Sequence, residues 1–131
     1  MDIVRLVKAD AERQLAGALK TRKNERIASA LQQLVEASLP RPSMPHTRVR
    51  RAHPAAKGHP HRVWRWVAAT GLVHLVAEAL DDYETIALTA YLTHPGLSGR
   101  REMLYRDVTD QPGNVGGLVA AAVRQIQHRL G

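Results

Sequence analysis

Residues 84–93 read ETIALTAYLT, and their side chains alternate between apolar and polar more regularly than in any other segment of the chain. Every second position from Ile86 to Leu92 is apolar, and the positions between them are mostly threonine and tyrosine. A period of two residues is typical of a β-strand that turns one face toward the core. The segment therefore predicts a strand, and its neighbours in sequence should supply the rest of a sheet.

Two other segments have strand-like composition. Residues 61–80 contain two tryptophans and several β-branched residues, which favour a strand, with a bend or turn at Thr70-Gly71. The part from Leu72 to Leu80 also fits a helical stripe, so a helix stays open as an alternative. Residues 101–108 have the composition of a further strand after the loop that contains Pro95. Together these segments predict a three-stranded antiparallel sheet.

Helices are predicted at both ends of the chain. Apolar residues recur at helical spacing in residues 2–20 and 27–39, and Pro40 ends the second stripe. The polar residues 21–24 between them allow either a helical hairpin or one long helix. Residues 115–130 carry another apolar stripe, which should cover the sheet. The predicted fold class is α+β: an N-terminal helix or helical hairpin, a connector, a three-stranded antiparallel sheet and a C-terminal helix on that sheet.

The connector is the most unusual part of the composition. The stretch around it, residues 40–66, reads PRPSMPHTRVRRAHPAAKGHPHRVWRW and holds five of the seven prolines and four of the seven histidines. Seven Lys or Arg residues and no Asp or Glu lie between residues 37 and 77. Scattered prolines exclude a helix or a central strand, because each removes a backbone donor. The chain is therefore divided into a helical segment 1–39, a basic connector 40–62 and a sheet-plus-helix domain 63–131, or forms one domain that includes the N-terminal helices.

A concentrated block of positive charge favours a directed contact with a polyanion. The chain carries 19 Lys or Arg and 12 Asp or Glu, a net charge of +7. Basic side chains bind phosphates with release of counterions, and tryptophans beside them can stack on bases. The predicted nucleic-acid-binding residues are Arg48, Arg50, Arg51, Lys57, Arg62, Trp64, Arg65 and Trp66. DNA and RNA, and single and double strands, stay open as ligands.

The histidines and acids are weighed for catalysis and metal binding. His59 and His61 have the spacing of an imidazole pair that binds zinc, copper or nickel, but no acid lies within ten residues and the chain has no cysteine. The acidic residues Asp81, Asp82 and Glu84 have the composition of a solvated turn. We therefore expect no metal site, no cofactor and no enzymatic activity, and whether the two histidines bind metal stays open.

The aromatic and cysteine content of the chain bears on its oligomeric state and location. Aromatic residues make up 4% of the chain and phenylalanine is absent, so the core is small and a homodimer would help to bury it. The absence of cysteine and of a long apolar run predicts a cytoplasmic protein with no membrane partner. The sequence thus predicts a small non-enzymatic nucleic-acid-binding protein. The alternative is a protein-interaction module, such as an adaptor, inhibitor or assembly subunit, whose basic arm binds an acidic protein surface.

Overall fold

The computed structural model describes residues 3–39, 48–49, 53–54, 58–96 and 100–131. Its elements are, in order, helices α1 (Ile3–Thr21) and α2 (Asn24–Ser38), strands β1 (Arg48–Val49), β2 (His53–Pro54), β3 (His61–Ala68), β4 (Gly71–Ala79), β5 (Ile86–Thr93) and β6 (Arg101–Thr109), the 3₁₀ turn η1 (Pro112–Asn114) and helix α3 (Val115–Leu130). The α+β class, the two N-terminal helices, the antiparallel sheet and the C-terminal helix are confirmed.

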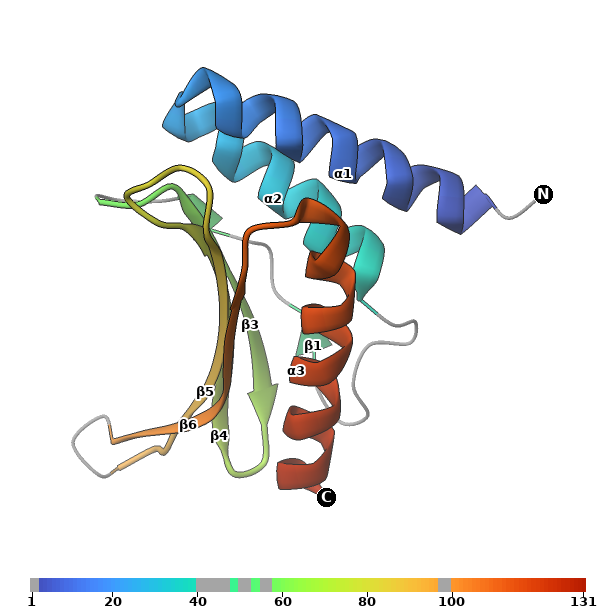
Figure 1. The fold of residues 1–131 in the computed structure, drawn as a ribbon. Helices are drawn as coiled ribbons and strands as arrows, with labels where there is room; N and C mark the ends of the chain where they lie inside the picture. Colours follow the sequence, from blue (N-terminus) through green and yellow to red (C-terminus); the bar gives the residue numbers. More distant parts are fainter. Residues whose placement is uncertain (1–2, 40–47, 50–52, 55–57, 97–99) are drawn as a thin grey trace.

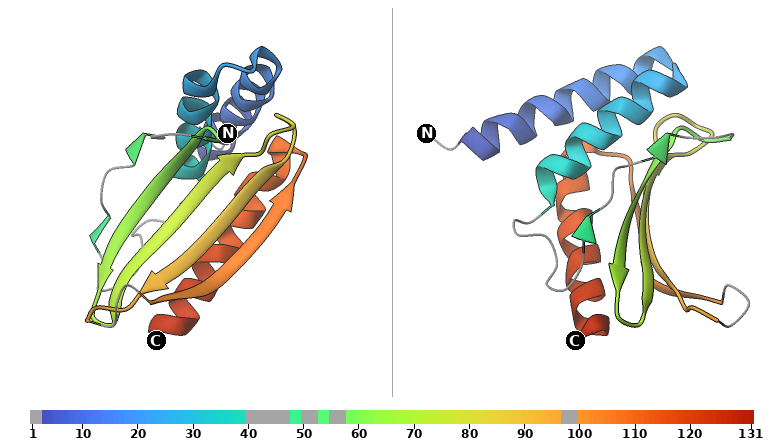
Figure 2. Two further views of the ribbon diagram at one scale, coloured as in Figure 1. Left: turned by 90° about the vertical axis from the view of Figure 1, so that its left-hand side faces the viewer. Right: turned by 180° about the vertical axis from the view of Figure 1, so that it is seen from behind.

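The sheet is an antiparallel meander of four long strands in the order β3, β4, β5, β6 (Figures 1 and 2). The two-residue strands β1 and β2 both pair with the outer edge of β3. The predicted number of three strands was wrong, because residues 61–80, counted as one strand with a bend or turn at Thr70-Gly71, form a hairpin of two strands. The preference for strand over helix in this segment is confirmed.

Gly71 explains why the hairpin turns where it does. Ala68 pairs with Gly71, so Ala69 and Thr70 make the turn between β3 and β4. Gly71 has a φ of +152°, a conformation that side chains with a Cβ rarely adopt, and a Cβ there would overlap the carbonyl oxygen of Thr93. Glycine therefore lets the tip of the hairpin approach β5 closely.

The N-terminal helices form a hairpin, which resolves the alternative of one long helix. The break lies at Arg22, whose φ of +55° is left-handed. The hydroxyl of Thr21 donates to the Ala18 carbonyl oxygen at 2.6 Å and closes the last turn of α1. Within the part of the chain that the structure describes, no helix is both long and apolar enough to cross a membrane.

All three helices lie on the same side of the sheet. Helix α2 packs over β3 and β4, α3 packs over β5 and β6, and α1 lies on α2 (Figure 1). One buried cluster joins residues of all three helices to the inner face of the sheet, and its largest fully buried side chains are Trp64, Trp66, Leu15, Ile27, Leu31, Leu34, Leu75, Ile86, Leu88, Leu92 and Ile126. Each such side chain contributes about 1.5–3 kcal/mol through removal from water. The opposite face of the sheet carries no described helix (Figure 2, left).

Candidate functional site

The helix-free face of the sheet is the candidate functional surface. Strand register places its side chains in rows, because residues directly opposite each other in an antiparallel sheet lie on the same face. From β3 to β6 the four rows are His61–Glu78–Ala87–Val108, Val63–Val76–Thr89–Arg106, Arg65–His74–Tyr91–Met103 and Val67–Leu72–Thr93–Arg101. A β-bulge between Ala90 and Tyr91 shifts the pairing of β6 by one residue. The face is therefore a grid of apolar, aromatic and basic groups.

Arg65, His74 and Tyr91 of the third row and Arg101 of the fourth row form a continuous stack of planar groups. The rings of His74 and Tyr91 are parallel to within 11°, with centroids 4.6 Å apart. Arg101 places its guanidinium carbon 4.9 Å from the centroid of Tyr91, and Arg65 directs Nε toward Nδ1 of His74 at 3.4 Å. Because β4 and β6 flank β5, the imidazole and the guanidinium approach Tyr91 from opposite sides. Among the described residues, the stack thus holds two arginine side chains in position without a carboxylate.

The surroundings of His74 in this stack favour its neutral form. Burial lowers its pKa below the ordinary value, and the nearby charges of Arg65 and Arg101 lower it further. A neutral imidazole can accept a hydrogen bond at Nδ1, as the approach of Arg65 requires. The positive charge of the stack therefore resides on the two arginines at its ends, Arg65 and Arg101.

The charge of this face is positive on balance. Among its described side chains, Arg65, Arg101 and Arg106 are basic and Glu78 is the one acid. Arg106 donates to the Thr89 hydroxyl at 2.9 Å and lies 4.0 Å from Glu78. Within the described residues, neither Arg65 nor Arg101 makes an ion pair with a carboxylate. Two guanidinium groups on this face thus keep donors for an external anion.

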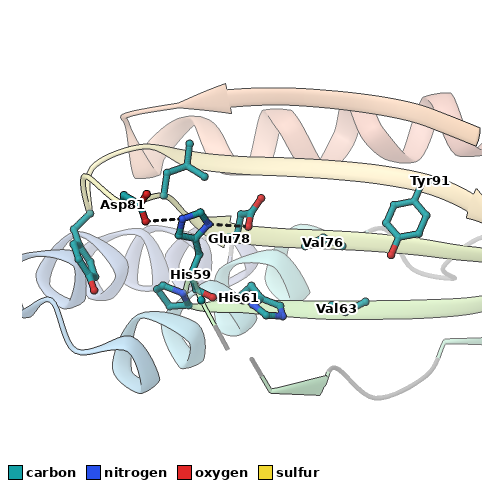
Figure 3. A pocket seen from close by; sticks show the side chains of 11 residues that line it. His59, His61, Val63, Val76, Glu78, Asp81 and Tyr91 are labelled. Atoms are coloured by element: carbon teal, nitrogen blue, oxygen red, sulfur yellow. Dashed lines mark hydrogen bonds and ion pairs between the residues drawn. The ribbon is translucent and has the colours of Figure 1, made fainter. Parts of the chain in front are cut away.

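A hollow of about 570 Å³ opens at one end of the face (Figure 3). Its lining comes from the segment before β3 and the start of β3, the middle and end of β4, the following turn and Tyr91, and consists of Gly58, His59, Pro60, His61, Val63, Val76, Glu78, Leu80, Asp81, Tyr83 and Tyr91. Val63 and Val76 are opposite each other in the register and give the hollow an apolar wall. Glu78 and His61 form its polar end.

His59 is held between two carboxylates beside the hollow (Figure 3). Its Nε2 lies 2.7 Å from Oδ1 of Asp81, and its Nδ1 lies 3.4 Å from Oε2 of Glu78. The hydrogen bond with Asp81 is the main reason that the pKa of His59 is raised, despite partial desolvation. This arrangement joins the start of β3 to the turn after β4.

The two histidines of the His-x-His pair do not converge. Both ring nitrogens of His59 face carboxylates, whereas Nδ1 of His61 lies 2.8 Å from the backbone oxygen of His59. Among the described residues, no group of three or more His, Asp or Glu side chains is placed to hold a metal ion.

Three of the predicted nucleic-acid-binding residues lie in the core. Trp64 is 1% exposed and donates from Nε1 to Glu36 at 3.3 Å, and Trp66 is fully buried. Arg62 is 6% exposed and is occupied by α2: Nε donates to Gln32 at 3.0 Å and Nη2 to Glu25 at 3.1 Å. The strand alternation of β3 turns these three side chains toward α2, so the two indoles cannot stack on bases in this structure. Arg65 lies between Trp64 and Trp66 in β3, so its side chain points to the opposite side of the strand and reaches the helix-free face.

The connector residues have mixed placement. Arg48 belongs to β1, whose backbone pairs with β3 at Val67. Arg50, Arg51 and Lys57 lie outside the described residues. A contact between these four residues and phosphates therefore stays a prediction.

Sequence reasoning missed the residues that complete the site: His74, Tyr91, Arg101 and Arg106. Each lies on a segment predicted as a strand or preferred as one, and the alternation of residues 84–93 already separated Tyr91 from the core side of its strand. What was lacking was the register between strands, which brings His74 opposite Tyr91 and Arg65.

Searches against protein-family models, curated proteins and solved structures find no match to this chain.

Proposed function

We propose that this protein is a small non-enzymatic nucleic-acid-binding protein whose helix-free sheet face binds phosphates through Arg65 and Arg101. The observation that carries the proposal is the presence of two preordered guanidinium groups without carboxylate partners in the described chain. Planar guanidinium groups bind phosphate oxygens in a bidentate manner, and a side chain that is already ordered loses less entropy on binding. Nucleic acid, with its repeated phosphates, fits two such groups on one surface.

The distribution of charge supports the same surface. β1 and β2 pair with β3, so the basic connector joins the sheet at the edge nearest Arg65. Arg50 and Arg51 fall in sequence between β1 and β2, and Arg48 is part of β1. A contact between these connector cations and the same ligand is part of this proposal. The cytoplasmic location predicted from composition belongs to the same proposal.

Homodimerisation remains part of the proposal. Ile3, Leu6 and Val7 are exposed by 73%, 51% and 53% and share one side of α1 by their spacing. An exposed apolar stripe on a helix end is the kind of surface that two copies bury together. Light scattering across a protein concentration series measures the oligomeric state.

The test is fluorescence anisotropy of labelled oligonucleotides across a salt series. The variant Arg65→Gln/Arg101→Gln should bind more weakly, and its plot of log K against log salt should be shallower by roughly 1.4–1.8, since each phosphate contact contributes about 0.7–0.9. The matched control is Arg26→Gln/Arg124→Gln, which removes the same charge from exposed positions on α2 and α3. An equal loss in both variants would assign the effect to net charge, and no binding of wild type at low salt would refute the proposal.

A protein-interaction module is the second candidate. Its supporting observation is the exposure of apolar side chains on the same face, with Val67 at 47%, Met103 at 65% and Val108 at 47%. An acidic partner with an apolar centre would pair with such a surface. This candidate predicts purified protein free of absorbance at 260 nm, whereas a nucleic-acid binder should carry nucleic acid that high salt removes.

A further inference from the structure

We propose that the ligand is a single-stranded nucleic acid whose bases lie on the helix-free face, with one base in the hollow beside Val63 and Val76. This inference rests on the proposed function and names the class of nucleic acid. It follows from how apolar and basic groups are interleaved on the face, from the shape of the face and from the chemistry of the hollow.

The interleaving of groups favours unpaired bases. Apolar side chains occupy positions in all four rows, among them Val63, Val76, Leu72, Met103 and Val108, and they lie within one or two positions of the arginines. A duplex presents phosphates and sugars on its outside, against which these side chains gain little. Unpaired bases present flat, weakly polar surfaces that pack on apolar and planar groups, while the backbone meets the cations.

The shape of the face points the same way. Reading of a duplex in the major groove needs a helix or a narrow two-stranded ribbon that enters the groove. The described helices all lie on the other side of the sheet, and this face presents four adjacent strands (Figure 2, left). A broad sheet surface is too wide for a groove but matches the span of a strand whose bases are splayed out.

The chemistry of the hollow suits a base and disfavours a phosphate. Glu78 lies in it and disfavours a phosphate, but its carboxylate can accept a hydrogen bond from the exocyclic amine of a base. Val63 and Val76 supply an apolar wall for the ring. Arg65 lies two residues from Val63 along β3, about 6.6 Å away at the backbone, which is on the scale of one nucleotide. A base in the hollow therefore leaves its phosphate near the Arg65–His74–Tyr91 row.

The experiment compares four labelled 12-mers at fixed salt: single-stranded DNA, single-stranded RNA of the same sequence, the corresponding DNA duplex, and an abasic DNA strand. Both the duplex and the abasic strand should bind at least about tenfold more weakly than the preferred single strand, because stacking of bases adds to the phosphate contacts. The DNA and RNA strands distinguish the two sources of the same chemistry.

The variant Val63→Thr/Val76→Thr tests the hollow itself. It keeps the shape and charge of the wall but makes it polar, and both positions are only partly buried on the sheet surface, so the fold should be retained. Affinity for the single strand should fall at least threefold, while affinity for the abasic strand stays unchanged. Ala120→Ser, at an exposed position of α3 on the opposite side of the sheet, is the control and should leave both affinities within twofold.

The two proposals fail in different ways. If the duplex or the abasic strand binds as tightly as the single strand, while Arg65→Gln/Arg101→Gln still weakens binding, the inference is refuted and the proposed function stands. If no oligonucleotide binds at low salt, or if the arginine variant has no effect, the proposed function itself is refuted.

Discussion

Substitution of Arg62 distinguishes a structural role from a phosphate-binding role more clearly than substitution of any other predicted nucleic-acid-binding residue. Its sequence context, in the basic connector beside Trp64, predicted a contact with phosphate. The structure places its guanidinium against α2, where it donates to Gln32 and Glu25, and to the backbone oxygen of His61 at 3.3 Å. Replacement of Arg62 by alanine should therefore destabilise the fold and leave the affinity of the folded protein for nucleic acid unchanged.

The magnitude follows from what alanine removes. The two lost methylene groups of the buried stem are worth about 1.6 kcal/mol. The hydrogen bond to Gln32 adds about 1 kcal/mol. The ion pair with Glu25 adds less than about 1 kcal/mol, because the Glu25 side chain is 81% exposed and water screens it. The expected loss of unfolding free energy is roughly 2–4 kcal/mol.

The assay is urea unfolding followed by tryptophan fluorescence, since both tryptophans are buried in the folded state. With an m-value of about 2 kcal/mol per M, the midpoint of Arg62→Ala should fall by roughly 1–2 M. Arg62→Met keeps the stem and should lose about half as much. Arg26→Gln, at an exposed position on α2, should leave the midpoint within about 0.3 M.

The opposite pattern would refute this reasoning. It consists of an unchanged urea midpoint for Arg62→Ala together with a salt dependence of binding that is shallower by about 0.7–0.9. Arg62 would then be a phosphate contact, and its placement against α2 would not describe the protein in solution.

Three further predictions concern stability. Gly71→Ala should lower the urea midpoint by roughly 1 M or more, because the added Cβ meets the Thr93 carbonyl and the φ is strained. The raised pKa of His59 means that its stabilising contacts are complete below the ordinary pKa of about 6.5 and are lost as pH rises through the folded-state value, so wild type should lose more stability between pH 5.5 and 8 than His59→Asn. Hydrogen bonds from the Thr85 side chain and the Thr85 and Glu84 backbone lower the pKa of Asp82 to about 2, so the stability that Asp82 contributes is present above its ordinary pKa and is lost as pH falls toward 2. Asp82→Ala should therefore lose less stability than wild type over that pH range in acid unfolding. Identical acid unfolding profiles for the two proteins would contradict this.

The sequence predicted the type and position of the helices and strands better than the number of strands. The alternation in residues 84–93 and the apolar stripes of the three helices are local patterns, and the structure confirms them. The hairpin within residues 61–80 was counted as one strand with a bend or turn at Thr70-Gly71, because Ala69-Thr70 does not have the composition of a usual turn pair. The signal was Gly71, whose role depends on the close approach of Thr93 from β5.

The candidate site was predictable only in part. Arg65 was named from the basic run, and it does reach the helix-free face. Trp64 and Trp66 were assigned to stacking because aromatic residues beside arginines have that use in proteins that bind single strands. In a chain without phenylalanine, the same two indoles are the largest groups available to fill the core under α2, and burial of that area outweighs their exposure to a ligand.

By itself, the sequence determined the α+β composition, the helical stripes, the alternation of the strands and the concentration of positive charge between residues 37 and 77, because all of these depend on neighbours within a few positions. Only the tertiary structure decided which side of β3 faces the helices, and so which of Arg62 and Arg65 is buried. It also decided that His74, Tyr91 and Arg101 meet on one face. The physical reason is that facing and register depend on pairing between strands far apart in the chain, and a shift of one residue would exchange the two faces.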